Sequence, residues 1–130
     1  MNSRHELISK SEANSQGGIR IKLPLIIFEE GGATICYCPA LDLSGYGYDE
    51  KEALESYEYV TEEYFNHTIE KKTLEKDLKR LGWQVKNTHH KHIIPPPVTK
   101  LLESNSNFKR VFEKFDYKKL STNVNFPAFS

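Results

Sequence analysis

Residues 19–48 of the 130-residue chain read IRIKLPLIIFEEGGATICYCPALDLSGYGY, and this stretch decides the fold. At first every second residue is apolar, which is the period of a β-strand. The adjacent Gly31 and Gly32 favour a tight hairpin turn, because both central residues of such a turn can need positive φ. Strand patterns at 33–38 and 41–48 follow. The stretch therefore predicts a three-stranded antiparallel meander.

The sequence after the meander predicts one long and one short helix. Asp49 is a suitable N-cap, and Glu52 three residues later suits reciprocal capping. Apolar residues recur at spacings of three and four over 53–65, while acids occupy the positions between them. A shorter helix is predicted over 73–81. It should end at Gly82 in the left-handed conformation that glycine favours.

The remaining segments predict further strands and short helices. Residues 83–86 (WQVK) start a further strand by alternation, and the three prolines at 95–97 form a stiff extended connector. Short helices are expected at 98–102 and 108–115. The alternating run 120–126 (LSTNVNF) suits a strand added to an edge, either of its own sheet or of a partner's sheet. The predicted class is α+β: a three-stranded antiparallel meander, a helix and a further strand, with a short second helix and a small helical and extended C-terminal addition.

The organisation of the chain follows from these patterns. Residues 1–18 are expected to be a flexible N-terminal extension, residues 19–94 an α+β domain, and residues 95–130 a proline-led C-terminal extension with short helices and a terminal strand. The longest apolar stretch, 23–28, contains Pro24 and is far shorter than the roughly 20 residues of a membrane helix. No secretory signal is recognisable, so a cytoplasmic protein without membrane contact is expected.

Charge is distributed unevenly along the chain. The 18 Lys+Arg and 18 Asp+Glu give a formal net charge of zero. Residues 1–65 nevertheless hold five basic and twelve acidic residues, and the remainder holds thirteen and six. This balance excludes the uniformly basic composition of a typical nucleic-acid binder and the high net charge of a disordered chain. Two oppositely charged local surfaces remain compatible with it.

The residues with metal-binding or thiol chemistry predict no cofactor. Cys36 and Cys38 lie two apart on one face of a strand, where a disulfide would need unusual geometry, so free packed thiols are expected. A cluster of three histidines, His89, His90 and His92, is expected to be exposed rather than to bind a metal.

Four short motifs occur in a fixed order within residues 19–86. They are residues 28–32 (FEEGG), 35–41 (ICYCPAL), 45–48 (GYGY) and 49–54 (DEKEAL). In this order and spacing they resemble the HicB-type antitoxins. The resemblance covers about half of the chain.

The resemblance implies a βββαβ unit like a truncated ribonuclease H fold. It implies a bacterial, non-enzymatic antitoxin of a type II toxin–antitoxin system, which binds and neutralises a small basic mRNA-cleaving toxin of HicA type. It also implies a homodimer or higher homo-oligomer. Many members of the family carry a C-terminal DNA-binding domain. This chain departs from that pattern, because neither a helix-turn-helix nor a ribbon-helix-helix is recognisable after Pro97.

An enzyme is not expected from the residues themselves. A ribonuclease H-like nuclease needs several carboxylates converging on two metal ions, yet the first strand has none before Glu29. No nucleophile motif on a strand-turn-helix and no phosphate-binding loop is present. We therefore predict no catalytic, cofactor-binding or metal-binding residues.

The acids of the long helix have two interpretations. One is a solvated outer face that keeps the protein in solution. The other is an electrostatic match to a basic toxin, because opposite charge speeds the encounter and like charge suppresses binding of nucleic acid. The candidate partner-binding residues are Glu52, Glu55, Glu58, Glu62 and Glu63.

Basic residues interleaved with aromatic residues in the last part of the chain support an alternative. Such a mixture can bind single strands through phosphate contacts and stacking. A nucleic-acid-binding regulator of operator DNA or RNA is one alternative function, and an orphan HicB-like protein without a toxin is another. The candidate nucleic-acid-binding residues are Lys109, Arg110, Lys114, Lys118 and Lys119.

The apolar C-terminal segment gives a hypothesis of self-association. Val124 and Phe126 would line one face of an added strand, beside further apolar residues at 127–129. Deletion of residues 120–130 would then convert a dimer to a monomer.

Overall fold

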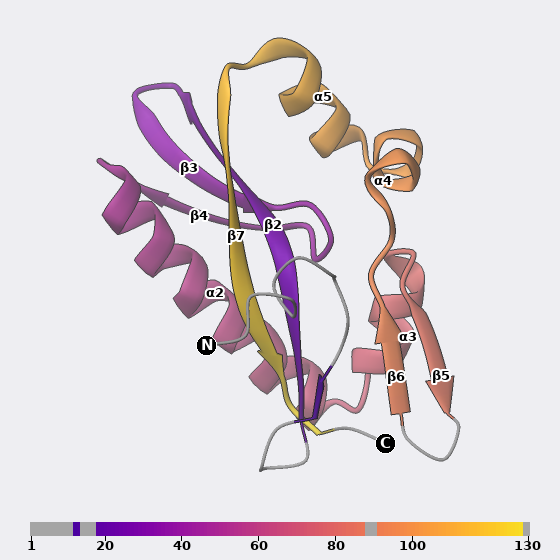
Figure 1. Ribbon diagram of the computed structural model, residues 1–130. Coiled ribbons are helices and arrows are strands. Elements are labelled where there is room, and N and C mark those ends of the chain that lie inside the picture. The colour runs from indigo at the N-terminus through magenta and orange to yellow at the C-terminus, as the bar shows by residue number, and fades with distance from the viewer. Residues whose placement is uncertain (1–11, 14–17, 88–90, 129–130) are drawn as a thin grey trace.

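The chain folds around an antiparallel sheet with helices on both faces (Figure 1). The structure, a computed structural model, describes residues 12–13, 18–87 and 91–128. In chain order the described elements are β1 (Glu12–Ala13), β2 (Ile19–Glu30), β3 (Ala33–Cys38), β4 (Leu43–Gly47), α2 (Glu50–Glu70), α3 (Leu74–Arg80), β5 (Gln84–Asn87), β6 (Lys91–Ile94), α4 (Val98–Ser104), α5 (Ser106–Lys114) and β7 (Tyr117–Phe126). The long strands lie in the order β4-β3-β2-β7. The predicted α+β class is confirmed.

The predicted meander is built on a hairpin of two glycines. Gly31 and Gly32 adopt φ angles of 62° and 81° between the paired residues Glu30 and Ala33. Glycine adopts positive φ without steric strain, so these residues close the hairpin between β2 and β3. β4 then pairs antiparallel with β3 along the whole of β4.

The last strand of the sheet comes from the C-terminal part of the chain. β7 pairs antiparallel with β2, from Ile19 opposite Phe126 to Phe28 opposite Tyr117. The alternation at 120–126 predicted a strand here, and the strand begins three residues earlier, at Tyr117. The sequence is compatible with pairing either to the chain's own sheet or to a partner's sheet. In the structure the strand joins the chain's own sheet.

Pro24 lies within β2 rather than before it. Its partner in β7 is Ser121. On the opposite side β2 has β1 beside Arg20 and β3 from Ile26 onward, so among the described residues Pro24 is paired on one side only. A proline whose nitrogen faces the unpaired side removes no hydrogen bond from the ladder. β2 therefore runs through the proline.

The C-terminal apolar residues belong to the core of this chain. Val124 and Phe126 are 5% and 0% exposed. They are therefore not part of an exposed apolar end, whereas Pro127 is half-buried, Ala128 is exposed and Phe129 lies outside the described residues. Deletion of residues 120–130 would remove most of a core strand instead of a dimer contact.

The long helix begins with the predicted cap. The Asp49 side chain accepts a hydrogen bond from the Glu52 backbone N–H at 2.9 Å, and Glu52 Oε1 accepts one from the Tyr48 N–H at 2.7 Å. The reciprocal cap is thus present, with its second donor one residue before the N-cap. α2 ends at Lys71, and Lys72 adopts a φ of 57°.

The second helix ends as its sequence predicts. Gly82 has a φ of 98°, and the Trp83 N–H donates to the Leu78 carbonyl at 2.9 Å. The strand predicted at 83–86 is β5, which pairs with β6 in a separate two-stranded hairpin. The fourth long strand of the main sheet is therefore β7.

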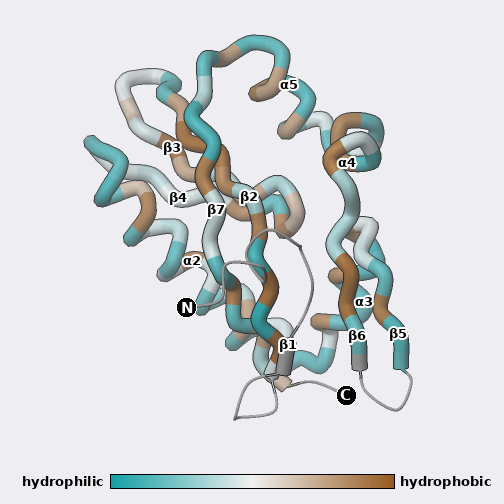
Figure 2. Tube along the Cα trace, in the orientation of Figure 1, coloured by the Kyte–Doolittle hydropathy of each residue, from teal (hydrophilic) through white to brown (hydrophobic). Residues whose placement is uncertain are grey.

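Buried side chains form two clusters, one on each face of the sheet, and Figure 2 shows hydrophobic residues concentrated along β2 and β3. The cluster under α2 includes Ile21, Leu25, Phe65, Trp83 and Phe126. The cluster under α4 and α5 includes Ile26, Phe28, Tyr37, Phe108 and Val111. Because side chains alternate along a strand, β2 supplies both clusters.

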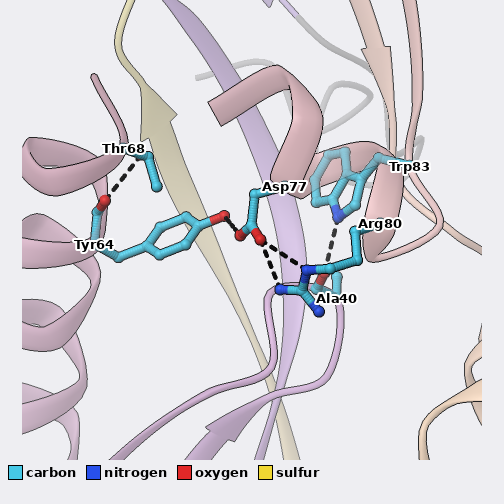
Figure 3. Close-up of polar contacts among 6 residues, drawn as sticks. All are labelled: Ala40, Tyr64, Thr68, Asp77, Arg80 and Trp83. Atoms are coloured by element: carbon cyan, nitrogen blue, oxygen red, sulfur yellow. Dashed lines mark hydrogen bonds and ion pairs between the residues drawn. The ribbon is translucent and has the colours of Figure 1, made fainter. Parts of the chain in front are cut away.

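Polar contacts join the helices and the hairpin to this frame (Figure 3). The Tyr64 hydroxyl donates to Asp77, which also accepts two hydrogen bonds from Arg80 at 2.9 and 2.7 Å. Trp83 Nε1 donates to the Ala40 carbonyl at 2.8 Å. These contacts fix α2 against α3 and the start of the β5–β6 hairpin against the loop after β3.

Candidate functional site

The five acids predicted to bind a partner lie on the outer side of α2, where all of them are exposed. We call this set the acidic face: Glu52, Glu55, Glu58, Glu62 and Glu63. Glu52 has the local role of capping the helix. The other four make no ion pair or hydrogen bond within the described part of the chain. Their carboxylates are therefore exposed to solvent and outside any ion pair among the described residues.

A large aromatic side chain lies among these acids. Tyr59 is 65% exposed on the same side of α2. Tyrosine offers apolar area together with a hydroxyl, and it is enriched at protein interfaces. The charge pattern of the helix does not single out Tyr59, although its position between Glu55 and Glu63 at helical spacing is a usable signal.

A groove borders the acidic face between α2 and β7. It encloses about 620 Å³. Its apolar lining includes Phe65, Ile69, Val124 and Phe126. Its exposed acids are Glu58, Glu62 and Glu70. We call it the α2–β7 groove. It combines an apolar floor with a negatively charged rim.

One buried polar group belongs to the lining of this groove. Tyr57 is 3% exposed, and its hydroxyl lies beside the side chains of Cys38 and Thr61. Burial raises the pKa of Tyr57, so the hydroxyl stays protonated.

The two cysteines lie in the core beneath α2. Both are buried free thiols, as the sequence predicts. Burial beside Cys38 raises the pKa of Cys36 to about 12, and burial also raises the pKa of Cys38. Since the thiolate is the reactive form, both thiols are inert in the folded protein.

We expect thiol labelling to report unfolding. At pH 8 Ellman's reagent should modify Cys36 at least about 100-fold more slowly in the folded chain than in urea, because the side chain is buried from the reagent and burial raises the pKa of the thiol to about 12. The folded state binds the proton more tightly, so the free energy of unfolding should fall as the pH rises from about 9 to 12. Rapid labelling of both thiols under native conditions would contradict this burial.

The five predicted nucleic-acid-binding residues do not form one surface. Arg110 makes a bidentate pair with Glu30 at 3.0 and 3.3 Å, and Lys118 contacts Glu50 at 3.1 and 3.3 Å. Lys119 follows Lys118 in β7, so the two side chains point to opposite faces of the sheet. The other two, Lys109 and Lys114, are exposed on α5. Neighbouring carboxylates thus balance two of the five cations.

The remaining observations concern the histidines, groups of metal-binding side chains and membrane-spanning helices. His92 is exposed, whereas His89 and His90 lie outside the described residues. Within residues 12–13, 18–87 and 91–128, no group of three or more His, Cys, Asp or Glu side chains could hold a metal ion. In the same ranges no helix is both long and apolar enough to cross a membrane.

Comparison of the chain with models of protein families, with curated proteins and with solved structures finds no match.

Proposed function

We propose that this protein is a non-enzymatic antitoxin of a bacterial type II toxin–antitoxin system. In this proposal it binds and neutralises a small basic mRNA-cleaving toxin of HicA type in the cytoplasm. The observation that carries the proposal is the acidic face of α2, whose Glu55, Glu58, Glu62 and Glu63 make no ion pair in the described chain. The motifs at 28–54 support the same family.

Electrostatics gives this surface a direct use against such a toxin. A protein that cleaves RNA carries positive charge on its RNA-binding face, and an exposed negative surface attracts that face over several ångströms. The same charge repels RNA from the antitoxin. Exposed Tyr59 supplies the aromatic contact area that strong interfaces concentrate near their centre.

Charge reversal on the outer part of the acidic face tests the proposal. With a HicA-type toxin from the neighbouring gene, Glu55→Lys/Glu63→Lys should lower the association rate constant at least about tenfold at low salt. The matched control is Glu103→Lys/Glu113→Lys, which makes the same charge change on exposed positions of α4 and α5. Stopped-flow fluorescence measures the rate.

Three outcomes contradict the antitoxin function. One is the absence of any complex at low salt, and another is an association rate that the control pair lowers as much as the α2 pair does. A third comes from gel-shift titrations: binding of promoter DNA or RNA without the toxin would favour a nucleic-acid-binding regulator acting through Lys109 and Lys114.

A further inference from the structure

The two edges of the main sheet are protected very differently. At the β4 edge, α2 covers outward backbone groups: Ser56 Oγ accepts from the Tyr46 N–H at 3.1 Å, and Glu52 accepts from the Tyr48 N–H. At the other edge, β7 pairs only with β2 within the described residues. The outer edge of a ten-residue strand is therefore open. An open edge is a template for another strand.

The open edge lies directly beside the α2–β7 groove. Residues 122–128 line this groove, opposite the second half of α2. Val124 and Phe126 point to the α2 face because they pair with core positions of β2, and Asn123 and Asn125 point to the opposite face. A strand added to this edge would place every second side chain over the apolar floor.

The rim of the groove specifies the charge of those side chains. Glu58 and Glu62 border the groove, are exposed and make no ion pair in the described chain. Lys and Arg have long apolar stems with a charged end, so they can cover Phe65 or Ile69 and still reach these carboxylates. Apolar side chains suit the floor, and acidic side chains would be repelled by the rim.

We propose that the β7 edge and the α2–β7 groove bind an extended segment of a basic partner, which adds to the sheet as a fifth long strand beside β7. Backbone hydrogen bonds to β7 give the segment its strand conformation. Every second side chain faces α2, and Lys or Arg at these positions covers the apolar floor with its stem and reaches the acidic rim with its charged end. This inference deepens the proposed function and rests on it only for the positive charge of the partner. It assigns Glu58 and Glu62 to the groove and leaves Glu55 and Glu63 to the outer surface.

A short peptide tests the groove without any toxin. The probe is a capped heptapeptide of alternating Lys and Val, and fluorescence anisotropy measures its dissociation constant for the full-length protein at low salt. Glu58→Lys/Glu62→Lys should weaken binding at least about tenfold. The matched control Glu103→Lys/Glu113→Lys, with the same change of net charge on exposed positions of α4 and α5 away from the groove, should retain the affinity within about threefold.

Backbone pairing has its own readout. Hydrogen exchange should slow in β7 when the peptide binds, and not in β4. A peptide N-methylated at every second residue should lose binding, because it cannot complete the ladder. A heptapeptide with Glu in place of Lys should not bind.

Several results would overturn the strand-addition site. They are equal binding of the acidic or N-methylated peptide, an equal loss of affinity in both charge-reversed variants, and protection away from β7. A dimer that the peptide dissociates in light scattering would assign the edge to a second copy of this chain. Peptide binding only after deletion of residues 1–11 would assign it to that segment. If the peptide binds as expected but a HicA-type toxin does not bind, the antitoxin proposal is wrong and the strand-addition site is retained.

Discussion

Replacement of Gly45 by alanine should destabilise the protein by at least about 3 kcal/mol. A Cβ at this position of β4 would lie 2.1 Å from the Tyr57 backbone nitrogen and 2.6 Å from the Ala53 carbonyl oxygen. Both atoms belong to the backbone of α2, so no side-chain rotation relieves the clash. The helix must move away from the sheet, which opens the buried contacts beneath it.

A second glycine gives the matched control. Gly32→Ala introduces the same methyl group at a φ of 81° with no atom within 4 Å, so only the backbone strain of about 1–2 kcal/mol is expected. Urea unfolding followed by circular dichroism measures both variants. If Gly45→Ala cost no more than Gly32→Ala, α2 would not lie so close to β4.

Truncation of Phe126 to alanine should destabilise the chain by about 3–5 kcal/mol. The side chain is fully buried, and its ring centroid lies 4.9 Å from that of Phe65 and 5.2 Å from that of Trp83. It therefore joins β7 to α2 and to the start of the β5–β6 hairpin. Its loss leaves a cavity where three segments meet.

An exposed phenylalanine provides the comparison for this substitution. Phe112 is 44% exposed on α5, so Phe112→Ala should cost less than about 1 kcal/mol. The two free energies of unfolding come from the same urea titration. Similar values for the two variants would mean that β7 is not part of the core. Because the deletion of residues 120–130 removes the buried Phe126, it should unfold the protein, and it is therefore unsuitable as a test of self-association.

The local signals in the sequence predicted the elements that short-range physics controls. The alternation in 19–28, the glycine pair at 31–32 and the left-handed Gly82 each act within a few residues. The Asp49 cap and the 3.6-residue period likewise determined which side of α2 faces solvent. The acidic face could therefore be read from the sequence, including its five glutamates.

The contacts between distant segments could not be read in this way. Alternation in 120–126 predicts a strand and its two faces, but the edge that it joins depends on β2, which lies about a hundred residues earlier. The ion pairs show the same limit, because Lys118 pairs with Glu50 on α2 and Arg110 pairs with Glu30 on β2. The strand pattern of 83–86 likewise does not show whether β5 joins the main sheet. The tertiary structure pairs it with β6 in a separate hairpin.

The sequence by itself thus determined the meander, the capped helix and the negative sign of its outer face. The packing of distant segments places β7 beside β2, leaves the outer edge of β7 unpaired among the described residues and forms an apolar groove between this edge and Glu58 and Glu62. The physical reason is that periodicity and capping are properties of neighbouring residues. Strand order and grooves arise when segments far apart in the sequence pack against one another, and local sequence patterns do not specify that packing.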